Sequence, residues 1–178
     1  KLTNKKVKTL IFRASQDGFK AKDLYKKCNG HSNTITIVKV HNGDIIGGYV
    51  SVKLKTSSLG YLKDDDAFLF SLTKNKIYPI KEEMKYYAIY MNKYYGPIFG
   101  GNKDNYSLCI SNECNNNKSF SKLGNENTAY ESNGDDCGTF IGYPSSNDKT
   151  GFIVDDYEVY EVELNEEIKL YYEWNDKN

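Results

Sequence analysis

The stretch that decides the fold is TITIVKVHNGDIIGGYVSV, residues 34–52. β-Branched residues dominate its first half, and a second β-prone run begins at Ile45, so the two halves read as the strands of one hairpin. Asn42-Gly43 between them is the preferred pair for a two-residue type I′ turn. The stretch therefore predicts an antiparallel β-hairpin, and with it a chain rich in β-structure.

The second strand of this hairpin contains an adjacent pair of glycines, Gly47 and Gly48. Glycine inside a strand costs backbone entropy and contributes no side chain to packing. Such a pair indicates a bulge, a bend, or the close approach of another group to the backbone. Neither this pair nor Gly100-Gly101 belongs to a phosphate-binding glycine motif. We therefore expect an architectural role, with protein rather than a small molecule against the glycines.

Short β-type segments separated by turn residues continue along the chain, and only one helix is clear. Ala21, Leu24, Tyr25 and Cys28 fall on one helical face, lysines 20, 22, 26 and 27 cover the other, and Asn29-Gly30 ends the helix. The further β-type segments are 7–12, 67–72, 76–80, 85–91, 98–99, 106–111, 152–164 and 168–174. This count predicts a mainly β chain (α+β by count), namely a two-sheet antiparallel β-sandwich with one clear helix and short flanking helical turns.

The predicted strand over 152–164 contains an irregularity at Glu158. By strict alternation, Glu158 falls on the same face as apolar residues such as Val154 and Val162. Either a bulge shifts the register within the strand, or Glu158 points inward and is paired with Arg13 or with a backbone N–H. The sequence leaves both alternatives open.

Residues 1–164 are expected to form a single domain, and residues 165–178 an extension or linker that could belong to the same domain. The chain begins with lysine rather than methionine, so we expect a fragment of a longer protein. No long apolar region follows the basic start, and no stretch approaches the roughly 18 apolar residues of a membrane span, so neither a signal peptide nor a transmembrane segment is predicted.

Charge and cysteine usage restrict the function further. The 24 basic and 24 acidic residues cancel, which argues against a dedicated nucleic-acid-binding protein. The four cysteines form no CxxC pair, and reduced thiols in the cytosol are expected. Cys28 and Cys109 lie in apolar patterns and are predicted to be buried and inert. Cys114 and Cys137 lie in polar segments and are the candidate redox thiols.

No catalytic, metal-binding or cofactor-binding set stands out. His31 and His41 lie near turns and are expected to be exposed. The acidic run at 64–66 lacks the spaced ligands of a calcium loop and reads as a solvated loop whose acids cap the next element. Residues 112–130 read as a long polar loop, which is uncommon in a compact domain. We expect a non-enzymatic domain without cofactor or metal.

Six segments in order resemble the TLDc domain family over about residues 7 to 164. These segments are FRASQDGF at 12–19, GGY at 47–49, AFLFSL at 67–72, GG at 100–101, TF at 139–140 and YEVY at 157–160. The resemblance implies a two-sheet antiparallel sandwich with a few helices. The motif residues that it places here, most of them structural, are Arg13, Asp17, Gly47, Gly48, Phe70 and Glu158.

The resemblance also implies a function. TLDc proteins are implicated in resistance to oxidative stress and in binding the vacuolar proton-pumping ATPase, and no established enzymatic chemistry attaches to the domain. The resemblance therefore implies a monomeric protein-interaction domain in the cytoplasm, peripheral to an endolysosomal or vacuolar membrane through a protein partner. Two alternatives remain open, a thiol-based redox module using Cys137 with or without Cys114, and an adaptor domain of a larger multidomain protein.

Overall fold

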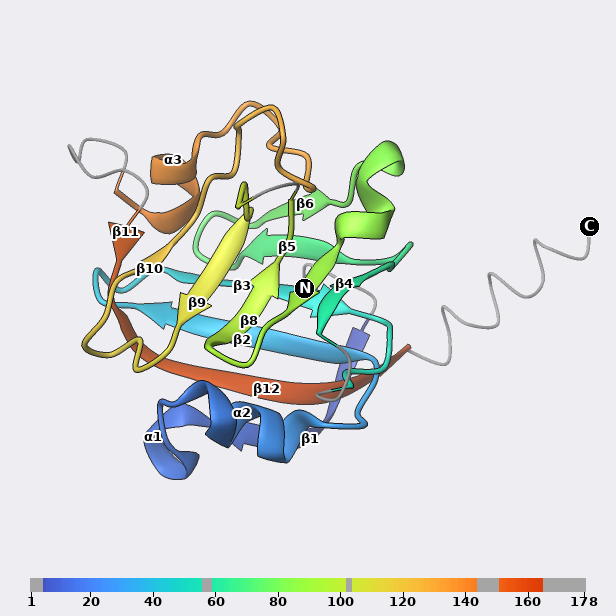
Figure 1. Ribbon diagram of the computed structural model, residues 1–178. Helices are drawn as coiled ribbons and strands as arrows, with labels where there is room; N and C mark the ends of the chain where they lie inside the picture. Colours follow the sequence, from blue (N-terminus) through green and yellow to red (C-terminus); the bar gives the residue numbers. More distant parts are fainter. Residues whose placement is uncertain (1–4, 56–58, 102–103, 144–150, 165–178) are drawn as a thin grey trace, which may run out of the picture.

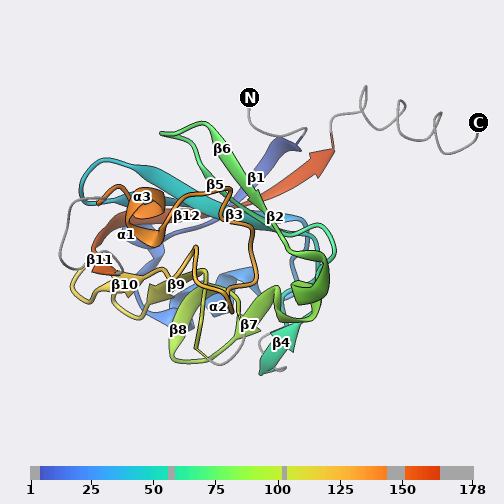
Figure 2. The same cartoon turned by 90° about the horizontal axis from the view of Figure 1, so that it is seen from above.

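A computed structural model describes residues 5–55, 59–101, 104–143 and 151–164. Within these ranges the chain forms two six-stranded antiparallel sheets that stack face to face (Figures 1 and 2). The strands of one sheet run steeply across those of the other (Figure 1), as in sandwiches of the crossed type. The predicted mainly β two-sheet sandwich is confirmed. The β-type segment expected at 168–174 lies outside the described residues.

The first sheet contains both the first and the last strand of the described chain. Its order is β1-β12-β2-β3-β5-β6. The strands are β1 (Lys5–Arg13), β12 (Val154–Leu164), β2 (Thr34–Val40), β3 (Ile45–Val50), β5 (Phe68–Ser71) and β6 (Lys76–Pro79). Lys5 faces Leu164 and Arg13 faces Glu158 in the β1–β12 pair. The described chain thus enters and leaves the fold along one edge of this sheet.

The second sheet consists of shorter strands in the order β11-β10-β9-β8-β7-β4. They are β11 (Gly151–Phe152), β10 (Ser119–Phe120), β9 (Leu108–Ser111), β8 (Tyr95–Phe99), β7 (Ile89–Met91) and β4 (Gly60–Leu62). β11 and β12 are separated only by Ile153 but belong to different sheets. The strand predicted over 152–164 is therefore interrupted near its start, where the chain crosses from one sheet to the other.

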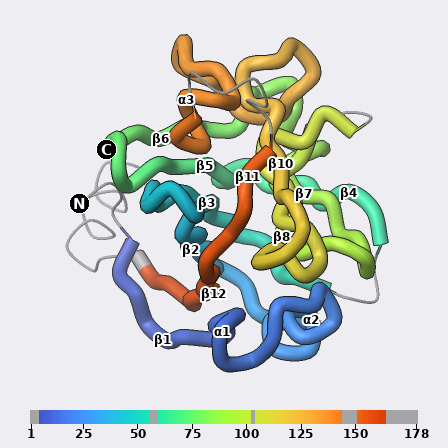
Figure 3. Tube along the Cα trace, turned by 90° about the vertical axis from the view of Figure 1, so that its left-hand side faces the viewer, coloured from blue at the N-terminus to red at the C-terminus, as the bar shows by residue number. Residues whose placement is uncertain are grey.

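Helical segments lie at two opposite ends of the sandwich. α1 (Ala14–Asp17) and α2 (Ala21–Cys28) lie at the end away from α3 (Cys137–Ile141) (Figures 1 and 3). The helix predicted from its apolar face is α2, whose Ala21, Leu24 and Cys28 are buried. The segment expected to be β-like at 85–91 is instead the 3₁₀ helix η1 (Glu82–Tyr87) followed by β7. Its aromatic residues resemble a strand in composition, but the exposed ring of Tyr86 packs edge-on against Tyr87.

The hairpin formed by β2 and β3 is confirmed, but its turn type is not the predicted one. The turn closes through Gly43 N–H to Val40 O at 2.8 Å and Val40 N–H to Asp44 O at 2.9 Å. Gly43 has φ 94°, whereas Asn42 is not among the residues with positive φ. The loop is thus three residues long with one left-handed residue, and a type I′ turn would need two. Asn42 instead uses its side chain, which donates to Gly142 O at 2.9 Å and holds the turn against the end of α3.

The segment at 112–130 is a structural part of the sandwich rather than an exposed polar loop. It contains β10, and the buried residues Ser119, Ser121 and Thr128. The hydroxyl of Ser121 donates to Ser107 O at 2.6 Å, and that of Thr128 donates to Asn125 O at 2.7 Å. Buried backbone carbonyls need such donors. Small hydroxyl residues therefore make a polar sequence compatible with a buried path.

The two glycines of β3 permit close contacts on both faces of the first sheet. Pairing along β3 shows no register shift, so the bulge alternative does not apply. A Cβ at Gly48 would overlap the ring of Phe99 in the second sheet, and a Cβ at Gly47 would overlap the ring of Phe70 and Thr36 O. The expectation that protein groups approach these glycines is confirmed.

Asp64 is buried, and the prediction of a solvated acidic loop is wrong for this residue. Its side chain accepts hydrogen bonds from the Ser51 hydroxyl and the Ser51 N–H, both at 2.6 Å, from Val52 N–H at 3.3 Å and from Asp66 N–H at 3.0 Å. A carboxylate satisfied in this way is tolerated in the interior. Asp64 therefore ties the end of β3 to the loop before β5, while Asp65 beside it stays exposed.

Replacing Gly48 by valine should lower the free energy of unfolding by at least about 3 kcal/mol, because the new side chain cannot share space with Phe99. Urea unfolding followed by far-ultraviolet circular dichroism measures this. Lys39→Val places the same residue type at an exposed position of the adjacent strand and should change stability by only about 0.5 kcal/mol. Equal stability of Gly48→Val and the parent protein would contradict the close contact between the sheets.

Replacing Asp64 by alanine should destabilise the protein by about 2–4 kcal/mol, because four donors lose a charged acceptor. The matched control is Asp65→Ala, which removes the same charge one residue later from an exposed site and should cost little. If both variants unfold at the same urea concentration, Asp64 does not have the role assigned to it.

Candidate functional site

Three of the residues singled out by the family resemblance meet where β1 leads into α1. The Arg13 side chain bonds through Nε to Glu158 of β12, and the Tyr160 hydroxyl donates to the same carboxylate at 2.7 Å. The Arg13 N–H donates to Asp17 at 3.0 Å, and Asp17 pairs with Lys27 of α2 at 2.9 Å. These contacts join β1, α1, α2 and β12 into one unit.

The electrostatics of this junction follow from its hydrogen bonds. The bond from the Arg13 N–H, assisted by Lys27, lowers the pKa of Asp17 below its ordinary value. The bond with Glu158 raises the pKa of the Arg13 guanidinium. Asp17 and Arg13 are therefore held in their charged forms. This suits two structural ion pairs, Asp17 with Lys27 and Arg13 with Glu158, rather than proton transfer near neutral pH.

Glu158 shows which alternative for β12 is correct. A register shift lies between Val154 and Asp156 in the pairing with β2. Because of this bulge, Val154 and Tyr157 both belong to the buried core, while Glu158 keeps a partly exposed side chain paired with Arg13. The bulge alternative is right and the inward orientation is wrong, although the partner proposed for Glu158 is the one found.

Four motif residues form one row across the first sheet. Directly opposed residues run from Arg13 to Glu158, Ile37, Gly47 and Phe70. Opposed residues in a sheet share a face, and the neighbouring position Gly48 faces the second sheet through Phe99. The row therefore lies on the face turned away from the second sheet. Within this row, Arg13 bonds to Glu158, and Gly47 packs against Phe70.

A further tether that the sequence did not reveal involves Asp156. Its carboxylate accepts from the Ser15 N–H at 3.0 Å and from the Ser15 hydroxyl at 2.6 Å. Ser15 lies within α1, so this contact fixes the short helix to β12. No spacing rule links residues 141 positions apart, and only the β1–β12 pairing brings them together.

The four thiols fall into two groups. Cys28, Cys109 and Cys114 are buried. Burial raises the pKa of Cys28 and of Cys114 to about 12 and that of Cys109 still further. The expected burial of Cys28 and Cys109 is confirmed, whereas Cys114, a candidate redox thiol in a polar segment, is also buried because its segment packs inside the fold. Cys137, the first residue of α3, is partly exposed.

The two histidines each face a carboxylate. His41 is exposed and contacts Asp155 at 2.8 Å, and the partly exposed His31 contacts Glu161 at 3.1 Å. Among the residues that the structure describes, no group of three or more His, Cys, Asp or Glu side chains is arranged to hold a metal ion. Within the same ranges, no helix is long and apolar enough to cross a bilayer.

A groove beside α2 is the feature that sequence reasoning missed. It has a volume of about 330 Å³ and lies between α2 and the turn that joins β7 to β8. The described residues that line it are Lys22, Tyr25, Lys26, Asn29, Leu59, Met91, Asn92 and Lys93. From the sequence, Lys22 and Lys26 are predicted only to lie on the polar face of a helix. Their spacing of four residues was the one available signal that they share a side.

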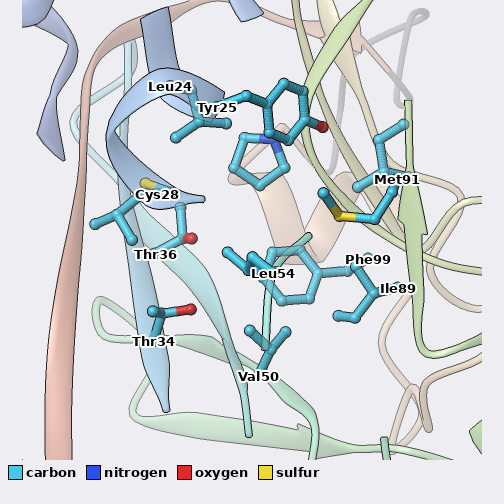
Figure 4. A pocket seen from close by; sticks show the side chains of 13 residues that line it. Leu24, Tyr25, Cys28, Thr34, Thr36, Val50, Leu54, Ile89, Met91 and Phe99 are labelled. Carbon is cyan, nitrogen blue, oxygen red and sulfur yellow. The ribbon is translucent and has the colours of Figure 1, made fainter. Parts of the chain in front are cut away.

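A small apolar cavity of about 30 Å³ lies next to the groove, inside the sandwich. It shares Tyr25 and Met91 with the groove. Figure 4 shows side chains from α2, β2, β3, β7 and β8 directed toward this common space, among them Leu24, Val50 and Phe99. The groove therefore has a charged rim, and the apolar residues in its lining also form part of the wall of the cavity.

A model of the TLDc domain family matches residues 2–163 of the chain. No curated protein matches the chain. The matched range includes the whole described sandwich up to the penultimate described residue of β12.

The stabilisation that Asp17 provides should depend on pH. Its pKa is lowered in the folded state, so its contribution is present above the unfolded pKa, near 3.9, and is lost as the pH falls through the folded value. We expect Asp17→Asn to be less stable than the parent between about pH 5 and pH 7, with the difference shrinking below about pH 4. Urea unfolding across this range measures it. Asp65→Asn is the control, and a difference independent of pH would contradict the assigned role.

Proposed function

The chain belongs to the TLDc domain family, and from this membership we propose that it is a protein-interaction domain that binds the vacuolar proton-pumping ATPase and acts in resistance to oxidative stress. The observation that carries the proposal is the family match over residues 2–163. The proposed setting is the cytoplasmic side of an endolysosomal or vacuolar membrane, reached through the protein partner.

The contacts of the motif residues support a domain that works by presenting surfaces. Arg13, Asp17 and Glu158 bond to one another and to neighbouring elements. Gly47 and Phe70 pack together on the same sheet. Side chains committed in this way hold the fold in shape, which leaves partner recognition to the exposed loops, helices and grooves around them.

Binding between the purified protein and purified subunits of the pump tests the proposal. We expect saturable binding of at least one subunit at about 10 µM or below, measured by biolayer interferometry. An unrelated β-sandwich domain immobilised at the same density is the control. If no subunit binds at about 100 µM, the proposed partner is wrong, although the family membership is unaffected.

The difference between Cys137 and the other three thiols favours a second function, a redox response. The proposal assigns it to Cys137 alone, because a partly exposed thiol reacts far more readily than buried thiols of raised pKa. After mild peroxide treatment, mass spectrometry should find oxidation of Cys137 and not of Cys28, Cys109 or Cys114. Cys137→Ser should remove the signal. Equal oxidation of all four thiols would contradict this proposed function.

A further inference from the structure

We propose that the groove beside α2 binds an acidic, extended segment of a protein partner, with an apolar side chain of that segment packing against the apolar lining of the groove. This inference rests on the proposed function of a protein-interaction domain and adds the site and the chemistry of the partner. The site is formed by Lys22 and Lys26 of α2, by Lys93 of the β7–β8 turn, and by Tyr25, Leu59 and Met91 between them.

The lysines of this region differ in whether the fold neutralises them. Lys20 pairs with Glu113 at 3.6 Å, and Lys27 pairs with Asp17 at 2.9 Å. Lys22 and Lys26, on the side of α2 that lines the groove, form no ion pair with any described residue. α2 thus directs its unneutralised lysines into the groove.

The opposite wall of the groove adds a third positive charge. The ammonium group of Lys93 lies 4.9 Å from the centre of the Tyr94 ring, an exposed aromatic next to it. None of the described lining residues is aspartate or glutamate. Three lysines around one concavity repel each other, and a carboxylate-bearing ligand relieves that repulsion. The charge of the groove therefore complements an acidic partner.

The groove also has apolar surface that a purely ionic ligand would leave exposed to water. Leu59 is 63% exposed at the rim. Tyr25 donates its hydroxyl to Gly96 O at 3.2 Å, which fixes its ring at the junction between the groove and the inner cavity. Anchoring of one apolar side chain in such a pocket, within a charged rim, is the usual arrangement of a binding hot spot.

The spacing of the lysines indicates the backbone form of the ligand. Side chains four residues apart on a helix, as Lys22 and Lys26 are, lie about 6 Å apart. Alternate residues of an extended peptide point to one side and lie about 6.6 Å apart. Two glutamates at alternate positions of an extended segment therefore match the two lysines, and a leucine two residues further along packs against the apolar lining of the groove.

The concave shape favours a peptide over the other anionic surfaces that lysines attract. A flat bilayer surface does not fill a concavity as an extended segment does, and a nucleic acid offers no aliphatic side chain for the apolar lining of the groove. Binding to vesicles or to RNA in place of the peptide is an outcome that overturns the proposal.

The test uses a fluorescein-labelled peptide, GEAEALG, titrated with the full chain at low salt and followed by fluorescence anisotropy. We expect saturable binding that Lys22→Ala/Lys26→Ala weakens about tenfold or more, as expected for loss of two charge contacts. The double variant Lys6→Ala/Lys63→Ala removes the same charge from exposed sites outside the groove and should bind like the parent. Leu59→Ser, or alanine for leucine in the peptide, should weaken binding several-fold.

Three results would overturn the proposal. They are equal weakening by both double variants, binding of GKAKALG as tightly as GEAEALG, and lysine-dependent binding of phosphatidylserine vesicles or single-stranded RNA without peptide binding. Thermal unfolding of each variant shows that the fold is intact.

The pump subunits are then tested with Lys22→Ala/Lys26→Ala. Retained subunit binding with no peptide binding refutes the groove alone, whereas lysine-dependent peptide binding without subunit binding refutes the pump alone.

Discussion

The distance between the two sheets is set at Gly48 of β3, which has no side chain. Phe99 of the second sheet occupies the space above Gly48, and Tyr130 packs edge-on against Phe99 while its hydroxyl donates to Ala88 O at 2.8 Å. A side chain at Gly48 would push the sheets apart and open these contacts. The packing of the second sheet, the path of the segment up to residue 130 and the walls of the cavity beside α2 all depend on this close approach.

Local pattern was sufficient to predict the elements whose sequence repeats with a structural period. The hairpin of β2 and β3, the apolar face of α2 and the sandwich class follow from such periods. The pattern failed where a polar side chain forms hydrogen bonds to buried main-chain groups. Asp64 and Ser121 look like solvent-exposed residues in the sequence, yet they are buried because each satisfies main-chain groups. A polar residue that bonds to buried backbone cannot be told from an exposed one by composition alone.

The candidate site could be predicted only in part for a related reason. The pairing of Arg13 with Glu158 could be proposed because an acid on an apolar strand needs a partner. The groove beside α2 could not, because its residues come from three separate parts of the chain and its character depends on which lysines the fold leaves without an acid. That distinction between Lys22 and Lys27 exists only in three dimensions.

The pairing of β1 with β12 also determines how the domain would respond to mechanical load. Lys5 and Leu164 are direct neighbours in an antiparallel pair, so a force that separates these two residues acts across the strands rather than along them. The hydrogen bonds between β1 and β12 would then break one after another instead of sharing the load. Opening would proceed along β12, first through the ion pair between Lys8 and Glu161 at 3.0 Å and then toward the bond between Arg13 and Glu158. In tension, the Arg13–Glu158 pair and the Asp17 contact behind it form a second reinforced point, at which β1 and β12 are joined to the helices.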